Sequence, residues 1–138
     1  MIALDTNVAS ELINGNTDAR VSAWFQQQPE HTLYVPSVVM GELLRGVAIL
    51  PEGKRKEKLS KSVEEWLEQF EGRILPLDGS VARCYAVLAA KARSAGQTLG
   101  QNDAYIAATA QAKGFAIATR DVQPFRAAGL EVINPWET

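Results

Sequence analysis

Apolar runs of strand length alternate with amphipathic helical patterns along the whole chain, and this alternation constrains the fold more than any other feature. Five short apolar runs are predicted as strands, at residues 2–5, 33–35, 74–77, 115–119 and 131–133. Strands that alternate with helices usually form a parallel sheet. We therefore expect an α/β fold with helices on both faces of a parallel sheet.

The segments between these strands have helical spacing and recognisable ends. Residues 18–28 and 52–70 each place apolar side chains on one face, and the second of these helices is expected to pair with a helix that starts at Pro36 and Ser37. Asp78 is predicted to cap the next helix. Asn102 is predicted to cap the helix that contains Asp103, which Gly114 then closes.

Composition limits the class of protein. A chain of 138 residues is expected to form one domain, spanning 1–138, with a core that needs no disulfides. Cys84 is the only cysteine and is interpreted as a core residue. This fits a reducing cytoplasm, and we expect a cytoplasmic protein with no membrane segment.

The net charge is −2, so nucleic acid would not be held by overall charge alone. One local basic cluster spans residues 54–61 and is more simply read as a solvated helix face; its members are Lys54, Arg55, Lys56, Lys58 and Lys61.

Four acidic residues occupy comparable places in the predicted fold. Asp5 ends the first strand, Asp121 follows the fourth, and Glu42 and Asp103 lie in helices. Because active sites of α/β sheets lie at the carboxyl ends of the strands, we expect these carboxylates to converge there. Carboxylates about 4 Å apart repel by roughly 1 to 4 kcal/mol, so a divalent metal ion is the natural counter-charge.

Structural explanations compete with this hypothesis at three of the four positions. Glu42 has Arg45 three residues on as a possible ion-pair partner. Asp103 lies where a helix dipole favours a negative charge, and Asp121 is placed to cap a short helix. Asp5 has the weakest structural explanation, because Asn7 is available as the helix cap.

Five sequence blocks together resemble the PIN-domain ribonucleases, and more narrowly the VapC and FitB-type toxins of bacterial toxin–antitoxin modules. The blocks are DTN, PSVVMGELLRG, NDAYIAATA, ATRD and a closing NPW, and they cover almost the entire chain in order. The resemblance implies a PIN-like three-layer α/β/α fold with a five-stranded parallel sheet. It also implies a homodimer and an antitoxin whose C-terminal segment covers the site.

The same resemblance matches the four acidic residues to a quartet that binds Mg²⁺ or Mn²⁺. Hard oxygen ligands suit these ions. We expect Asp5 and Asp103 to be the main ligands, Asp121 to complete the set, and Glu42 to bind metal or to orient the attacking water as a base.

Other polar residues are assigned to the same pocket. Asn7 and Thr119 match pocket residues of the family, and together with Thr6 they are predicted to orient the carboxylates. Arg120 is a candidate contact for substrate phosphate, with a surface ion pair as the alternative. The only histidine, His31, is expected to lie exposed before the second strand, which makes metal-free acid–base cleavage improbable.

These observations favour a metal-dependent endoribonuclease toxin that cleaves RNA and is neutralised by an antitoxin. One alternative is a non-catalytic PIN-like module that binds RNA or protein. A weaker one is an aspartate-based phosphatase, which usually needs a second aspartate where this chain has Asn7. We expect the antitoxin to lie across the helical hairpin of residues 38–50 and 59–70, where Trp66, Leu67 and Phe70 provide apolar area.

Overall fold

Five parallel strands form the centre of the molecule in a computed structural model that describes all residues, 1–138. The strands are β1 (Ile2–Leu4), β2 (Leu33–Pro36), β3 (Ile74–Leu75), β4 (Ala116–Ala118) and β5 (Val132–Ile133), in the order β3-β2-β1-β4-β5. Every neighbouring pair is parallel. The predicted parallel sheet is confirmed, although four of the five strands are shorter than expected.

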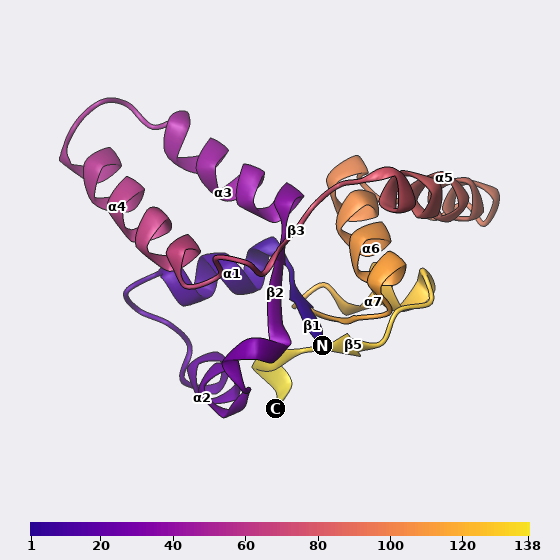
Figure 1. Cartoon of the computed structure of the whole chain (residues 1–138), viewed down its shortest axis with the longest axis horizontal. Coiled ribbons are helices and arrows are strands. Elements are labelled where there is room, and N and C mark those ends of the chain that lie inside the picture. The colour runs from indigo at the N-terminus through magenta and orange to yellow at the C-terminus, as the bar shows by residue number, and fades with distance from the viewer.

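Seven α-helices lie on either side of the sheet (Figure 1). They are α1 (Thr6–Ile13), α2 (Ala19–Gln27), α3 (Ser37–Ala48), α4 (Lys54–Glu68), α5 (Gly79–Ser94), α6 (Gln101–Lys113) and α7 (Val122–Ala127). There are also two 3-10 turns. The turn η1 (Glu30–Thr32) precedes β2, and η2 (Pro135–Glu137) is the last element of the chain. None of the helices combines the length and the apolar character needed to cross a bilayer.

The caps of two helices differ from the sequence prediction. Asp5, not Asn7, caps α1, because the chain passes from β1 into the helix without a loop and Asn7 is already helical. Asn102 likewise lies inside α6, which follows Gly100 and has no side-chain cap. The predicted cap at Asp78 is confirmed by its bond from the Val81 N–H.

Helices α3 and α4 form a hairpin that extends to the left in Figure 1, and α5 extends to the right. The predicted pairing of α3 with α4 is therefore confirmed. Trp66, Leu67 and Phe70 are buried within this chain, so they are not the surplus apolar surface that the sequence suggested. They belong to one continuous core with the sheet residues.

Arg73 ties the beginning of β3 to its surroundings. Its guanidinium donates to the carbonyls of Glu30, Leu33 and Gln69 and lies 4.8 Å from the centre of the Phe70 ring. Helix α4, η1 and β2 are thereby held together. Cys84 is only half-buried and lies outside the core, contrary to its interpretation as a core residue.

Candidate active site

The carboxyl ends of three neighbouring strands, β2, β1 and β4, bring the predicted acidic residues to one edge of the sheet. Asp5 follows β1 directly, and Asp121 lies three residues beyond β4. Glu42 is in α3, which follows β2, and Asp103 is in the first turn of α6. The negative charges of Glu42 and Asp103 both act on Asp5, and those of Glu42 and Asp121 act on Asp103, so the four residues form one electrostatic group.

Asp5 is the most buried and most firmly held of the four. Its carboxylate accepts the Thr6 N–H on Oδ1 and the Thr119 hydroxyl on Oδ2, each at 2.7 Å. Only 4% of the residue is exposed. The bond that caps α1 therefore also fixes the direction of a carboxylate in the pocket.

Thr119 is the centre of a wider network. Its hydroxyl oxygen accepts the Asn7 side-chain N–H at 3.3 Å and the Asp121 backbone N–H at 3.0 Å. The side-chain carbonyl oxygen of Asn7 accepts the Arg120 backbone N–H at 3.2 Å. The turn after β4 is thus bound to the first turn of α1, and both present their acidic residues to the same space.

Glu42 has a hydroxyl partner instead of a cation. The Thr6 hydroxyl donates to Glu42 Oε1 at 2.7 Å. None of the four ion pairs in the structure involves Glu42 or Arg45, so the predicted alternative of a structural ion pair between them is wrong. Glu42 is only half-buried, which leaves its carboxylate accessible from the pocket.

Burial and mutual repulsion alter the acidity of two members. The pKa of Asp5 is raised from 3.8 to about 6: burial raises it most, the bonds from Thr119 and Thr6 partly lower it, and the charges of Asp103 and Glu42 also raise it. The pKa of Asp103 is raised by burial first and then by Glu42 and Asp121. Because no basic side chain pairs with any of the four, their negative charge is uncompensated by the protein.

The donor set suits a hard divalent cation. All four side chains offer carboxylate oxygen, the ligand type that Mg²⁺ and Mn²⁺ prefer. No three acidic, histidine or cysteine side chains are close enough together to form a ready three-ligand set. Binding of Mg²⁺ does not require such a set, because this ion commonly binds through one or two carboxylates and keeps several waters.

Arg120 lies beside the pocket, and its side chain contacts an aromatic ring that the sequence did not predict as its partner. Its guanidinium carbon is 5.0 Å from the centre of the Trp136 ring, and it pairs with no acid. Trp136 is itself buried in η2, where the Asn134 side-chain oxygen accepts the Trp136 backbone N–H. No local spacing relates residues 120 and 136, because their contact depends on how the chain end returns past β4.

A groove that reaches Glu42, one of the four carboxylates, runs between α1, α3 and α4. Its volume is about 370 Å³, and its lining includes Thr6 and Glu42 at one end and the apolar side chains of Ile13, Leu59 and Val63. Gly46 lies in its wall, and a side chain added there would meet no atom within 4 Å. The sequence predicted the hairpin but not this set of lining residues, because α1 contributes one side of it.

Comparisons with known proteins agree with this architecture. The PIN domain family model matches residues 2–130. The chain is 49% identical to the VapC ribonuclease Y4jK of Sinorhizobium fredii and 42% identical to the toxin FitB of Neisseria gonorrhoeae, over 99% of each chain in both comparisons.

Solved structures give the same result. The crystal structure of FitAcB from Neisseria gonorrhoeae superposes with a TM-score of 0.93 at 41% identity, covering 100% of both chains. That of VapBC2 from Rickettsia felis, bound to a DNA fragment from its promoter, gives 0.79 at 26% identity, covering 97% of this chain and 98% of the other. Agreement in sequence and fold places the chain in the PIN domain family, among the VapC and FitB-type toxins.

Proposed function

We propose that the protein is an endoribonuclease toxin that hydrolyses RNA phosphodiesters with the help of Mg²⁺ or Mn²⁺ and is held inactive by a cognate antitoxin. The observation that carries the proposal is the group of four uncompensated carboxylates at the carboxyl edge of the sheet. Support also comes from relatives named as VapC ribonucleases. The chain is 49% identical to one of them, from Sinorhizobium fredii.

Asp5 and Asp103 are the proposed metal ligands, directly or through water, and Asp121 completes the shell through water. A bound ion would neutralise phosphate charge and lower the pKa of a water molecule. The chain's own contribution is orientation: Thr6 and Thr119 fix both oxygens of Asp5, so its remaining lone pairs have defined directions.

Glu42 is the proposed base. The Thr6 hydroxyl bonds Oε1, which leaves Oε2 free to accept a proton from the attacking water. The water oxygen forms a new bond to phosphorus while the bond from phosphorus to the 3′-oxygen breaks. The products are a 5′-phosphate and, after protonation by solvent, a 3′-hydroxyl.

The two alternative functions receive less support. An aspartyl phosphatase would need an acid at position 7, and Asn7 is instead bound to Thr119 and to the Arg120 N–H. A non-catalytic PIN-like module would be favoured by loss of acidic residues, and all four are present.

The groove between α1, α3 and α4 is the proposed antitoxin site. The relative from Neisseria gonorrhoeae is a toxin whose solved structures are named FitAcB and FitAB, the latter bound to a DNA fragment. An amphipathic segment would bury its apolar side on Leu59 and Val63 and reach Glu42 at the inner end. A basic residue there would pair with the carboxylates in place of the metal. The homodimer that the family resemblance implies is part of this proposal.

The direct test is neutralisation of single ligands. We expect Asp5→Asn and Asp103→Asn each to lower the rate of Mn²⁺-dependent RNA cleavage about a hundredfold or more, because each removes a charge that acts on the metal. Glu131→Gln, an exposed acid remote from the pocket, is the matched control. Circular dichroism and thermal unfolding verify that each variant is folded. Wild-type cleavage rates in both folded variants would contradict the assigned roles.

A further inference from the structure

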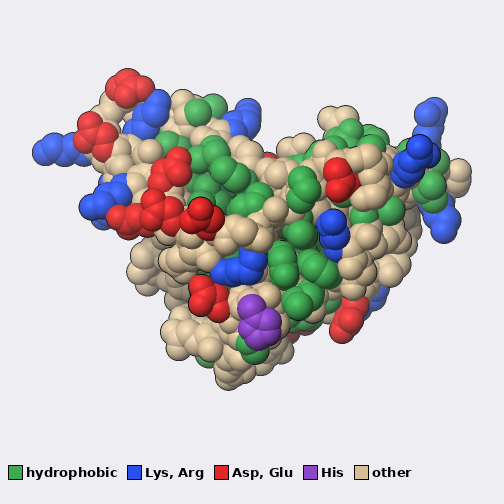
Figure 2. All heavy atoms as spheres, viewed as in Figure 1, with side chains coloured by type: hydrophobic (Ala, Val, Ile, Leu, Met, Phe, Trp, Pro, Cys, Tyr) green, Lys and Arg blue, Asp and Glu red, His purple; other side chains and the backbone are tan.

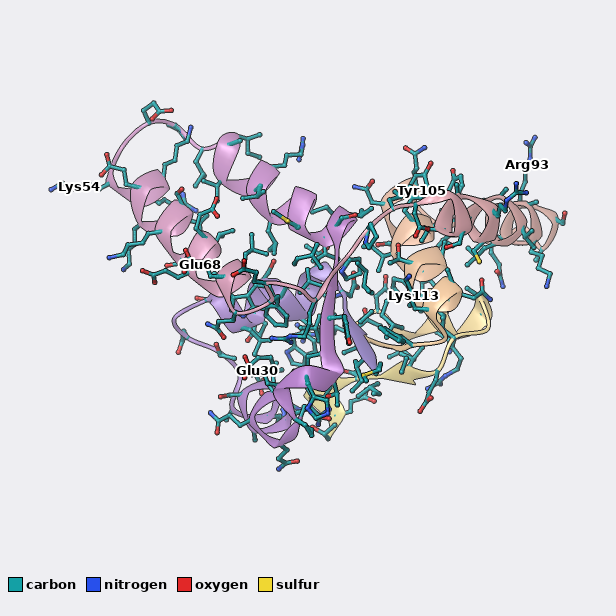
Figure 3. All side chains as sticks on the ribbon, in the orientation of Figure 1. Glu30, Lys54, Glu68, Arg93, Tyr105 and Lys113 are labelled. Carbon is teal, nitrogen blue, oxygen red and sulfur yellow. The ribbon has the colours of Figure 1, made fainter.

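The outer end of the α3–α4 hairpin carries five basic residues within eight positions. They are Lys54, Arg55, Lys56, Lys58 and Lys61, with Glu57 the only acid among them. Figure 3 shows Lys54 at the outer tip and Glu68 at the opposite end of α4, near the body of the molecule. In Figure 2, blue basic side chains lie at the same tip on the left together with red acidic ones, and further red ones follow the lower edge of the arm.

The basic residues differ in what they bind. Lys56 is half-buried and donates to the Glu52 carboxylate at 2.7 Å and the Ala48 carbonyl at 3.4 Å, so it holds the hairpin turn. Lys61 approaches Glu65 at 3.9 Å with both side chains well exposed, which is a weak pair. Lys54 and Lys58 form no ion pair.

Lys54, Lys58 and Lys61 share one face of α4. Their spacing of four and then three residues places them one above another on a helix. Val63, Trp66 and Leu67 are buried on the opposite face. The three ammonium groups are therefore presented to solvent as a stripe on a helix that the core holds in place; this set is called the lysine stripe below.

The lysine stripe lies on a different face of α4 from the groove, because Val63, which lines the groove, is buried opposite the lysines. Leu59, next to Lys58, lines the groove that has Glu42 at its inner end. Between Glu42 and Glu52 the chain contains no acid, and the exposed Arg45 lies between them. A polyanion that leaves the carboxylates along α3 therefore meets Arg45 and no further acid of that helix before the turn, where Glu52 lies.

We propose that the lysine stripe is a second contact surface for RNA, which binds backbone phosphates outside the cleavage site; this inference rests on the proposed ribonuclease function. The chain has a net charge of −2 and its pocket is acidic, so attraction for RNA must come from cations placed elsewhere. Phosphate contacts of this kind fix position and add affinity without reading sequence.

The experiment compares two triple variants with the same change in charge. Lys54→Gln/Lys58→Gln/Lys61→Gln removes the stripe, and Arg83→Gln/Lys91→Gln/Arg93→Gln removes three exposed, unpaired cations of α5. Binding of a single-stranded RNA oligonucleotide is measured in EDTA, without cleavage, by fluorescence anisotropy between 50 and 200 mM salt.

Three lost phosphate contacts should reduce the slope of log affinity against log salt by about 2. Over that fourfold salt range the wild type should lose about twentyfold more affinity than the stripe variant. The α5 variant should keep the wild-type slope. With Mn²⁺, the stripe variant should show a raised KM and an unchanged kcat.

The other outcomes separate the two proposals. A stripe variant with wild-type slope and KM, while the wild type cleaves RNA, overturns this inference and leaves the ribonuclease function standing. Equal losses in both triple variants would show an effect of net charge alone and overturn it too. Loss of antitoxin binding with RNA binding unchanged would assign the surface to a protein partner instead. A wild type that cleaves no RNA in any metal removes the proposed function, and the slopes in EDTA still decide whether the stripe binds RNA.

Discussion

Asp5 caps α1 through Oδ1, and the same carboxylate carries negative charge into the pocket. Its burial makes ionisation costly, and its two hydrogen bonds only partly offset that cost, so the pKa is about 6. In the unfolded chain the carboxyl has its ordinary value of 3.8. A structural cap would not need a second, buried hydroxyl partner or two acidic neighbours, so the strain at this residue is better explained by the site than by the helix.

This pKa predicts how the metal-free protein responds to pH. Between about pH 4 and pH 6 the folded state keeps a proton on Asp5 that the unfolded chain has lost, so the free energy of unfolding should fall as pH rises through this window. A shift of about two pKa units corresponds to roughly 3 kcal/mol. Urea unfolding in EDTA from pH 4 to pH 7 measures the slope.

Asp5→Asn is the matched variant for this measurement. Asparagine caps helices about as well as aspartate and still accepts the Thr6 N–H. Its unfolding free energy should therefore decline less across the window than that of the wild type. A decline of the same size in both proteins would show that Asp5 ionises normally.

The α3–α4 hairpin is the element that most affects access to the site. Its apolar face is buried in the core, its turn is fastened by Lys56, and its inner side forms one wall of the groove. Gly46 leaves that wall open, because no atom lies within 4 Å of where its Cβ would be. Glycine inside a helix lowers the stability of the helix. A requirement for space in the groove would explain why glycine stands at position 46.

We predict that Gly46→Leu weakens antitoxin binding at least tenfold, about 1.4 kcal/mol, by filling the groove. The control is Gly41→Leu, on the same helix, exposed, and equally free of nearby atoms. Both variants should be at least as stable as the wild type, since leucine favours helix over glycine. Titration calorimetry with the cognate antitoxin measures the affinities. Equal affinities for the two variants would place the antitoxin elsewhere.

Elements and contacts set by interactions between near neighbours in sequence can be predicted from the sequence, and those set by distant segments cannot. Apolar spacing predicted α2, the α3–α4 pair and α5, because each buries one face and the pattern is local. The caps of α1 and α6 were predicted wrongly, since Asp5 and Gly100 are set by how the preceding segment enters the helix. The partners of Glu42 and Arg120 depend on contacts between distant segments, namely Thr6 and Trp136, and no local pattern predicts them.

At the scale of the whole molecule, the strand order explains why residues from four segments share one pocket. Strand β1 lies between β2 and β4, so Asp5 is flanked by the elements that carry Glu42 and Asp121, and α6 leads into β4 with Asp103 at its first turn. The hydrogen bond from the Asp5 N–H to the Ala118 carbonyl, at 3.0 Å, fastens the two central strand ends to each other. The fold therefore holds like charges close together. Their mutual repulsion lowers the free energy of unfolding, and this cost limits how close the carboxylates can lie.

Metal binding should consequently stabilise the entire fold. An ion that binds only the native state adds about 2.7 kcal/mol at 100 times its Kd. For a chain of this size that corresponds to a rise in Tm of roughly 5 to 11 °C with Mg²⁺ or Mn²⁺. At the same metal concentration the gain should exceed that of an ordinary surface site, because relief of the repulsion, which adds to burial in raising the pKa values of Asp5 and Asp103, lowers the Kd.

Two quadruple variants isolate the site in that measurement. Asp5→Asn/Glu42→Gln/Asp103→Asn/Asp121→Asn should gain almost nothing from metal, whereas neutralising four exposed, unpaired acids elsewhere, Glu64, Glu68, Glu71 and Glu131, should leave the full gain. Because both variants lose four negative charges, a difference between them reports the pocket and not the overall attraction for cations. Equal shifts in Tm for the two variants, followed by calorimetric titrations with equal heats, would exclude the pocket as the metal site.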